Sequence, residues 1–278
     1  MLDSNLLNFL RSKSSSLVRE PADMLHFGCL QYAINKEYFD EYSDFGLVKY
    51  FSKEEEDHSK KDSSIDFNYY INDMGFRGIY PSTNDKKLFA FFGCSVAFGQ
   101  GLPEHQIYAD LISKHYNKKY LNLGIPGSGI HRIALTLSAA SNVWDIETAV
   151  INLPPFTRMH YVDTANRFQS ILLTHSTDQI DIEAVRVAIL KNFSDQFLAA
   201  DSLDAISWIL DISKSKKINL VLTSWDDDTI QLIKAGFNLD VLKFNMIDQG
   251  RDNHPGIESH QRFAEQVINI LSSETYTC

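Results

Sequence analysis

The chain has 278 residues and carries 36 acidic side chains against 26 Lys and Arg, a net charge of −10. This balance argues against nucleic-acid or anionic-membrane partners, because both are bound through clustered basic side chains. Hydrophobic residues make up 44% of the chain and charged residues 22%, which excludes disorder as a description of the whole. No apolar run approaches the roughly 20 residues that a membrane span needs.

Cysteine use and the first residues bear on location. Cys29, Cys94 and Cys278 form neither a disulfide framework nor a C-x-x-C metal pattern. The apolar patch near Met1 is too short for a secretory signal and no small-residue cleavage site follows it. We therefore expect a reduced, cytoplasmic setting and a chain without a bound metal ion.

The composition of the chain changes near residue 86. Residues 1–85 are rich in Asp, Lys, Ser, Tyr and Asn, and the stretch 52–64 is almost wholly polar. We interpret residues 1–85 as an N-terminal extension that packs on the main domain, and residues 86–278 as one α/β domain.

Apolar runs and amphipathic segments alternate through this domain. Five short apolar runs predict strands, at 88–92, 120–123, 149–153, 218–222 and 241–244. Segments with helical periodicity separate them, at 104–116, 130–143, 182–198, 202–213, 229–234 and 261–271. This order predicts a parallel sheet with helices on both faces and a ligand site at the carboxyl ends of the strands.

Glycine-rich turns follow the first two predicted strands. Gly93-Cys94-Ser95 comes directly after the first strand, where a serine hydroxyl would reach the edge of the sheet. The second turn, Gly124-Ile125-Pro126-Gly127, opens a helix and offers backbone N–H groups. Neither turn has the G-x-G-x-x-G or G-x-x-x-x-G-K-[ST] spacing of a nucleotide-phosphate site. Each turn alone is also what an ordinary chain reversal needs.

A third polar loop follows the last predicted strand. It contains Asp252 and His254, a histidine held before a proline with a carboxylate two residues earlier, which suits a general base and its orienting acid. Asp248 is a second candidate for the orienting group. We expect His260, in the helix that follows, to cap that helix or face solvent.

Together these blocks resemble the SGNH (GDSL-like) hydrolase family, in which a serine follows the first strand and a D-x-x-H-P element follows the last. The segment Asn72-Asp73-Met74-Gly75-Phe76-Arg77 is similar to an N-x-x-G-F-R segment that often precedes the serine block. The resemblance spans about residues 72–271. It implies a flavodoxin-like three-layer α/β/α sandwich with a five-stranded parallel sheet, and no cofactor.

The resemblance also implies roles for individual residues. Ser95 would be the nucleophile and His254 the base, with Asp252 orienting the imidazole. The backbone N–H groups of Ser95 and Gly127 would hold the oxyanion.

Two positions depart from the family. Phe156 stands near the expected place of the third-block asparagine, an oxyanion donor, and Thr157 or Arg158 is the candidate substitute. Asp252 and His254 are separated by one residue instead of two, and positions two apart in an extended segment face the same side.

The resemblance implies a serine esterase that hydrolyses a small ester, such as an O-acetyl group on a carbohydrate, through an acyl-enzyme. Two alternatives remain open at this point. One is a binding or interaction protein that keeps the fold without the chemistry, and the other is a sugar O-acyltransferase.

Overall fold

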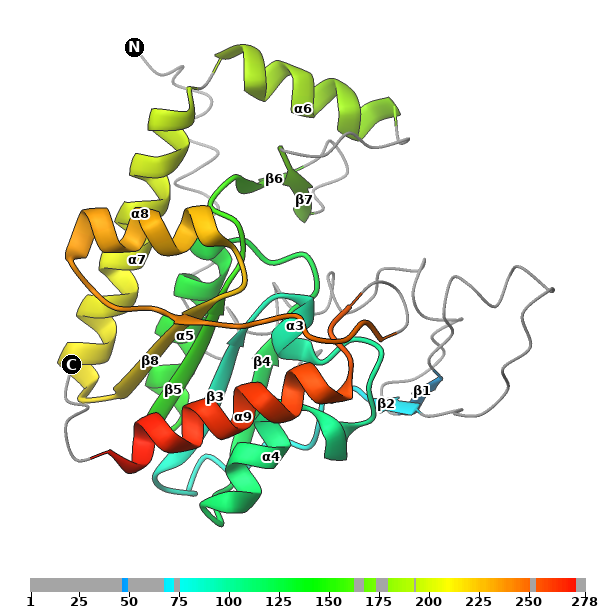
Figure 1. The fold of residues 1–278 in the computed structure, drawn as a ribbon, viewed down its shortest axis with the longest axis vertical. Coiled ribbons are helices and arrows are strands. Elements are labelled where there is room, and N and C mark those ends of the chain that lie inside the picture. Colours follow the sequence, from blue (N-terminus) through cyan, green and yellow to red (C-terminus); the bar gives the residue numbers. More distant parts are fainter. Residues whose placement is uncertain are drawn as a thin grey trace.

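In the computed structural model, which describes residues 47–49, 68–72, 76–162, 168–173, 180–192, 194–250 and 254–273, the centre is a parallel sheet of five strands (Figure 1). The strand order is β4-β3-β5-β8-β9. The bounds are β3 (Leu88–Gly93), β4 (Tyr120–Gly124), β5 (Ile146–Leu153), β8 (Asn219–Ser224) and β9 (Leu242–Lys243). By chain position this is the flavodoxin-like order 2-1-3-4-5, which confirms the predicted fold class.

The central strand β3 is apolar along its whole length because helices cover both faces of the sheet. Leu88, Ala90 and Phe92 point into one core, and Phe89 and Phe91 point into the other. The first core lies under α5 (Ile130–Val143), α7 (Asp195–Lys216) and α8 (Asp227–Phe237). The second lies under α4 (Tyr108–His115) and α9 (Ile257–Ser272). The continuous apolar run therefore reports burial on both faces.

Two short helical elements lie between β3 and α4. Helix α3 (Ser95–Phe98) starts immediately beyond the end of β3, and the 3-10 turn η2 (Glu104–Gln106) precedes α4. The predicted helix 104–116 is thus divided, because Ile107 between the two pieces is extended, with φ −80° and ψ 148°. The prediction for 130–143 agrees with α5 at both ends.

The region after β5 differs from the prediction of a long helical stretch. It begins with an antiparallel hairpin of β6 (Arg158–Val162) and β7 (Phe168–Leu172), which lies with α6 (Ile180–Asn192) beyond the end of the sheet where α3 begins (Figure 1). The predicted helix 182–198 is wrong as one element. Ser194 interrupts it and caps α7, accepting a hydrogen bond from the Phe197 N–H at 3.2 Å.

Part of the predicted N-terminal extension is described. β1 (Leu47–Lys49) pairs antiparallel with β2 (Asn68–Tyr70). Tyr69, Ile71 and Phe76 are buried, and Phe76 belongs to the first core.

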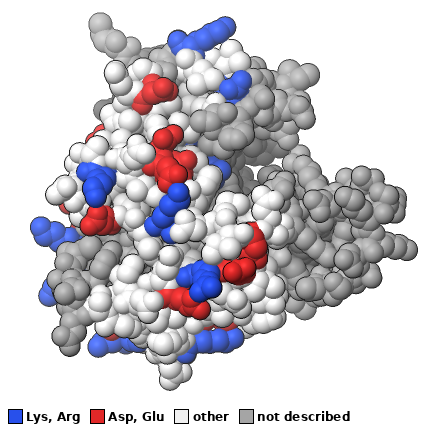
Figure 2. Space-filling view, in the orientation of Figure 1, with Lys and Arg blue, Asp and Glu red and all other residues white. Residues whose placement is uncertain are grey.

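Two surface properties follow from the described residues. On the part of the face in Figure 2 that the structure describes, Lys and Arg side chains lie among Asp and Glu without gathering into a basic patch. None of the described helices has a stretch long and apolar enough to cross a membrane.

Candidate functional site

Ser95 is the first residue of α3, at the carboxyl edge of the central strand. Its side chain is partly exposed, and its hydroxyl lies 4.0 Å from the Sγ of Cys94. Cys94 itself is buried in the second core. The structure thus places Ser95 where the sequence predicted it, at the edge to which the parallel strands bring their carboxyl ends.

Close backbone packing holds α3 in the corner between β3 and β4. Gly93 has φ +153°, and a Cβ there would lie 2.6 Å from the Asn152 carbonyl oxygen and 2.8 Å from the Ala97 Cβ. A Cβ at Gly124 would overlap the backbone nitrogen of Phe98 and lie 2.6 Å from the Ala97 carbonyl carbon. Glycine is therefore required at both positions for the backbone of α3 to lie directly on the strand ends.

Arg77 secures the opposite end of α3. Its guanidinium donates hydrogen bonds to the carbonyl oxygens of Phe98 at 2.9 Å, Gly99 at 2.7 Å and Leu102 at 2.7 Å. It also lies 4.6 Å from the centre of the Tyr69 ring, whose hydroxyl accepts a hydrogen bond from Gly101 N–H at 2.7 Å. Burial lowers the pKa of Arg77 from its ordinary value, although nearby acidic groups oppose this shift. The guanidinium thus donates to carbonyls at and just beyond the C-terminal end of α3.

The turn before Arg77 explains the N-x-x-G-F-R segment. The Asn72 side chain accepts a hydrogen bond from the Phe76 N–H at 3.1 Å and donates one to the Gly78 carbonyl oxygen at 2.9 Å. Phe76 enters the first core, which leaves Arg77 directed at α3. Sequence reasoning noted the segment but not this function of Arg77.

The second glycine-rich turn lies beside the serine turn. The Ile125 N–H donates to the Gly93 carbonyl oxygen, and the Ser128 N–H donates to the Ile125 carbonyl oxygen, both at 3.0 Å. Gly127 lies inside this turn with φ +79°. A hydrogen bond therefore connects Gly93, in the serine turn, to the turn that contains Gly127.

The turn after β5 carries no amide side chain in place of the family's asparagine. The Phe156 ring packs against the hydrophobic cores, while its N–H donates to the Thr229 hydroxyl at 2.9 Å. Asn152 is fully buried in β5, where its Nδ2 donates to the Thr223 hydroxyl at 3.0 Å and its Oδ1 has no hydrogen-bond partner among the described residues. Thr157 is partly exposed, and its Oγ1 is buried without a hydrogen-bond partner among the described residues.

Arg158 reaches the second glycine-rich turn from the start of β6. Its Nη1 donates to the Ser128 carbonyl oxygen at 3.5 Å, next to Gly127. Its side chain is partly buried. The structure thus brings Arg158 to the same edge of the sheet as the two glycine-rich turns.

His254 lies on the loop that connects β9 to α9. The two ends of this loop pair with each other. The Gly250 N–H donates to the His254 carbonyl oxygen at 2.7 Å, and Gln249 forms an isolated antiparallel β-bridge with Pro255. Asp252, the predicted orienting acid, lies outside the described residues. The charge of His254 is the smallest of the influences that lower the pKa of His260, after burial and Arg77.

The second orienting candidate, Asp248, is occupied by α9. Its carboxylate accepts hydrogen bonds from the Ser259 N–H at 2.7 Å, the Ser259 hydroxyl at 2.6 Å and the Glu258 N–H at 3.0 Å. Burial alone would raise the pKa of Asp248, but these bonds outweigh it and hold the pKa below its ordinary value. Asp248 therefore caps the helix that follows the His254 loop.

His260 does not face solvent, and that expectation was wrong. The ring is fully buried, and its Nδ1 accepts a hydrogen bond from the Tyr108 N–H at 3.1 Å, at the start of α4. Burial first, and then the charge of Arg77, lower the pKa of His260 to about 3. His260 is a neutral cap on a different helix from its own.

In the described part of the chain, Ser95 makes no hydrogen bond to His254; its hydroxyl partner is Cys94. Catalytic hydrogen bonds are often long in a ligand-free site and tighten on substrate binding. The described residues also contain no group of three or more His, Cys, Asp or Glu side chains placed to bind a metal ion.

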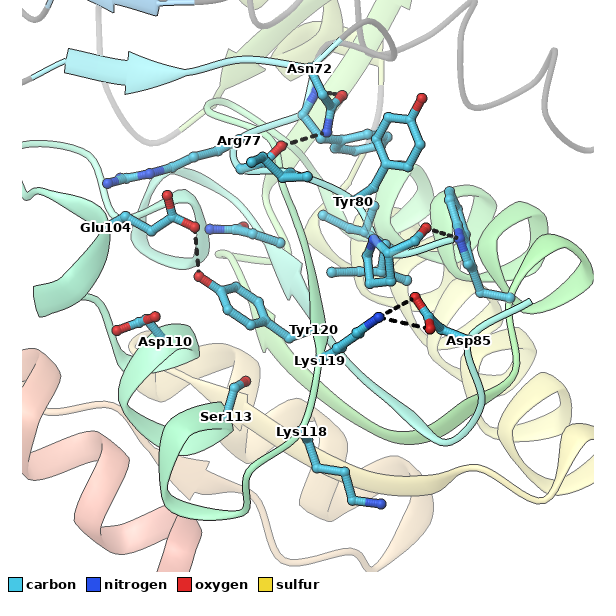
Figure 3. Close-up of a pocket in the computed structure, with 18 of the residues that line it drawn as sticks. Asn72, Arg77, Tyr80, Asp85, Glu104, Asp110, Ser113, Lys118, Lys119 and Tyr120 are labelled. Carbon is cyan, nitrogen blue, oxygen red and sulfur yellow. Dashed lines mark hydrogen bonds and ion pairs between the residues drawn. The ribbon is translucent and has the colours of Figure 1, made fainter. Parts of the chain in front are cut away.

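A separate cavity of about 530 Å³ lies along the outer edge of β4 (Figure 3). It includes none of the predicted site residues, and many of its charges are paired. Tyr120 donates to Glu104 at 2.8 Å, and Lys119 bonds Asp85 at 2.8 Å. Burial and the neighbouring Glu104 raise the pKa of Tyr120. This mutual pairing gives the cavity no evident reactive group, so the strand-end residues are the better candidate site.

No protein-family model matches the sequence. No curated protein matches it significantly. Solved structures do match. One is a carbohydrate esterase whose active site displays divergent catalytic and non-catalytic binding functions, at 13% identity and TM-score 0.45, covering 71% of this chain and 67% of that chain.

Two further structures are similar to the chain. A lipolytic protein of the G-D-S-L family from Veillonella parvula has 12% identity and TM-score 0.41, covering 67% of this chain and 98% of that one. AlinE4, an SGNH-hydrolase family esterase, has 14% identity and TM-score 0.38, covering 68% and 96%. All three TM-scores are below 0.5. The function is therefore inferred below from the strand-end residues of the chain itself.

The sheet order defines the class of fold: a flavodoxin-like α/β/α protein, with Ser95 and the turn of Gly127 at the carboxyl edge of its parallel sheet.

Proposed function

We propose that the chain is a serine esterase acting on a small ester, such as an O-acetyl group on a carbohydrate. The observation that carries the proposal is the position of Ser95 at the end of β3, beside the turn of Gly127 and on the edge of the sheet from which the segment leading to His254 leaves β9. Each motif alone suits an ordinary turn, and their meeting at one edge favours a reactive site.

The proposed reaction has two halves. The Ser95 Oγ attacks the ester carbonyl carbon, His254 takes the hydroxyl proton, and the alcohol leaves with that proton as the C–O bond breaks. Water then attacks the acyl-enzyme with His254 again as base, which releases the carboxylic acid and restores Ser95.

The oxyanion would be held by the backbone N–H groups of Ser95 and Gly127. The Thr157 hydroxyl, buried without a partner among the described residues, is our candidate for the third donor. Asp252 stays the proposed orienting group of His254.

Hydrolysis of p-nitrophenyl acetate tests the proposal. Wild-type protein should exceed Ser95→Ala by more than 100-fold, whereas Ser215→Ala, on the exposed end of α7, should match wild type. A fluorophosphonate probe should label Ser95 and lose this labelling in His254→Ala. Equal rates for wild type and Ser95→Ala would end the esterase proposal.

Phe156 supports a second candidate, a non-catalytic binding protein. Its ring packs against the hydrophobic cores and stands near the position where the family has an asparagine as oxyanion donor. In that case the fluorophosphonate probe leaves Ser95 unlabelled even at high concentration, while an acetylated sugar still binds.

A further inference from the structure

The guanidinium of Arg158 carries a charge that no acidic side chain among the described residues balances. Among the described residues its hydrogen bond goes to the Ser128 carbonyl oxygen at 3.5 Å, the long limit for such a bond, and no Asp or Glu forms an ion pair with it. A guanidinium has five N–H donors, so most of them remain available. A partly buried, unpaired cation loses hydration without compensation, which a bound anion would restore.

Three described cations, one buried beside α3 and two lining the cavity beside β4, are held by short bonds. The guanidinium of Arg77 makes three hydrogen bonds of 2.7 to 2.9 Å to backbone carbonyls. In the cavity beside β4, Lys114 pairs with Asp110 at 2.7 Å and Lys119 with Asp85 at 2.8 Å. Arg158 differs from all three because, among the described residues, it has neither an acidic partner nor a hydrogen bond shorter than 3.5 Å.

The β6–β7 hairpin directs Arg158 toward the site. Side chains alternate between the two faces of a strand. Met159 and its cross-strand partner Ile171 pack into the small cluster beneath α6 and α7. Arg158 therefore lies on the other face of the hairpin, where it meets the turn of Gly127 through Ser128.

We propose that Arg158 is a specificity-determining residue of the Ser95 site and binds an anionic group of the ester, with a carboxylate as the fitting chemistry; this rests on the proposed function. A planar guanidinium matches a carboxylate with two parallel hydrogen bonds. Because the chain as a whole carries a charge of −10, selection of an anionic ester needs such a local cation.

Paired esters that differ by one carboxylate test the assignment. Phenyl acetate and 3-acetoxybenzoate place the difference on the alcohol side, and p-nitrophenyl butyrate and mono-p-nitrophenyl succinate place it on the acyl side. Wild type should prefer the anionic member of at least one pair in kcat/KM. Arg158→Gln should reduce that preference about 10- to 100-fold, mainly through KM.

Two further variants serve as controls for the loss of preference in Arg158→Gln. Arg158→Lys keeps the charge but loses the planar fork, so it should recover only part of the preference. Lys216→Gln removes one positive charge at the far end of α7 and should leave the preference at the wild-type value. An equal loss of kcat for neutral and anionic esters in Arg158→Gln would instead assign Arg158 to the oxyanion and overturn the proposal.

A binding measurement separates this inference from the esterase proposal. In the Ser95→Ala background, calorimetry should show tighter binding of an anionic ester than of its neutral partner, and adding Arg158→Gln should remove the difference. If wild type hydrolyses no ester faster than Ser95→Ala, the esterase proposal fails and calorimetry alone decides on Arg158. If both anionic esters bind no better than the neutral ones, the Arg158 assignment fails.

Discussion

Arg77 donates a hydrogen bond of 2.9 Å to the carbonyl oxygen of Phe98, the last residue of the four-residue helix that Ser95 begins. A helix this short has no complete internal hydrogen-bond ladder. Its position therefore depends on the strand ends below it and on the guanidinium at its end.

Replacing Arg77 should loosen the serine turn and destabilise the fold. Arg77→Ala removes three short hydrogen bonds, and only the Phe98 and Gly99 carbonyls keep a weaker donor, from Asn122 at 3.4 Å and the Leu102 N–H at 3.2 Å. We expect a loss of about 2–4 kcal/mol in the free energy of unfolding, measured with urea. Arg77→Lys keeps the charge but cannot span three acceptors, so most of this loss should remain. Arg262→Ala, an exposed arginine paired with Glu265, is the control and should change stability little.

A methyl group at Gly124 should displace α3 from β4. The Cβ of Gly124→Ala would overlap the backbone of Phe98, and backbone cannot rotate away as a side chain can. We expect about 1–3 kcal/mol of destabilisation together with reduced fluorophosphonate labelling of Ser95. Gly236→Ala in α8 meets only the end of the Leu203 side chain and should be close to neutral. Wild-type labelling in Gly124→Ala would show that α3 tolerates the shift.

Substitutions of Thr157 test whether its hydroxyl has a structural or a catalytic role. Because its Oγ1 has no partner among the described residues, Thr157→Val should change stability by less than about 1 kcal/mol. If the hydroxyl donates to the oxyanion, kcat for p-nitrophenyl acetate should fall about 100-fold. Thr157→Ser, which keeps the hydroxyl, should retain most of the activity. Unchanged kcat in Thr157→Val would exclude Thr157 as the third donor.

Asp248 predicts a pH-dependent contribution to stability. The folded-state pKa lies below the ordinary value of 3.8, so the carboxylate stabilises the fold above that value and loses the effect as pH falls through the folded pKa. Asp248→Asn should cost about 1–2 kcal/mol at pH 7, because it weakens the cap of α9. Urea unfolding should show the two proteins converging below pH 3.8. A constant difference down to pH 2.5 would contradict the prediction.

His260 predicts a pH dependence in a higher range. Its pKa is about 3 in the folded chain against an ordinary 6.5, so the unfolded chain binds a proton that the folded chain refuses. Stability should therefore fall as pH decreases from 6.5 toward 3, by at most about 1.4 kcal/mol per pH unit. His260→Asn keeps an acceptor for the Tyr108 N–H and should flatten this slope. Equal slopes for both proteins between pH 4 and 6 would refute the assignment.

The sheet and the serine turn were predictable because their signals are local. A run such as Leu88 to Phe92, apolar at every position, has few interpretations other than a strand covered on both faces. The bounds of α5 followed from helical periodicity between Gly129 and Trp144. The hairpin after β5 was missed because a short antiparallel pair between helices leaves little periodic signal, and the cap at Ser194 was a readable signal that was overlooked.

The contacts of the site were less predictable because they join distant parts of the chain. Nothing near His260 in the sequence indicates that Tyr108 will provide its hydrogen bond. Arg77 stood in a visible motif, yet its three acceptors lie 21 to 25 residues further along. The direction of the Arg158 side chain could not be predicted either. Met159 and Ile171 show which face of the hairpin is buried, but only after the pairing of the two strands is known.

These separations also suggest the order in which the site is assembled during folding. The bonds from Arg77 to the end of α3 close loops of 21 to 25 residues, whereas the bond between Tyr108 and His260 closes one of 152. Closing a long loop costs more chain entropy. We therefore expect the contacts around α3 to form before α9 docks on α4 through His260. Pulsed hydrogen exchange should then show protection of the Gly101 amide before that of the Tyr108 amide.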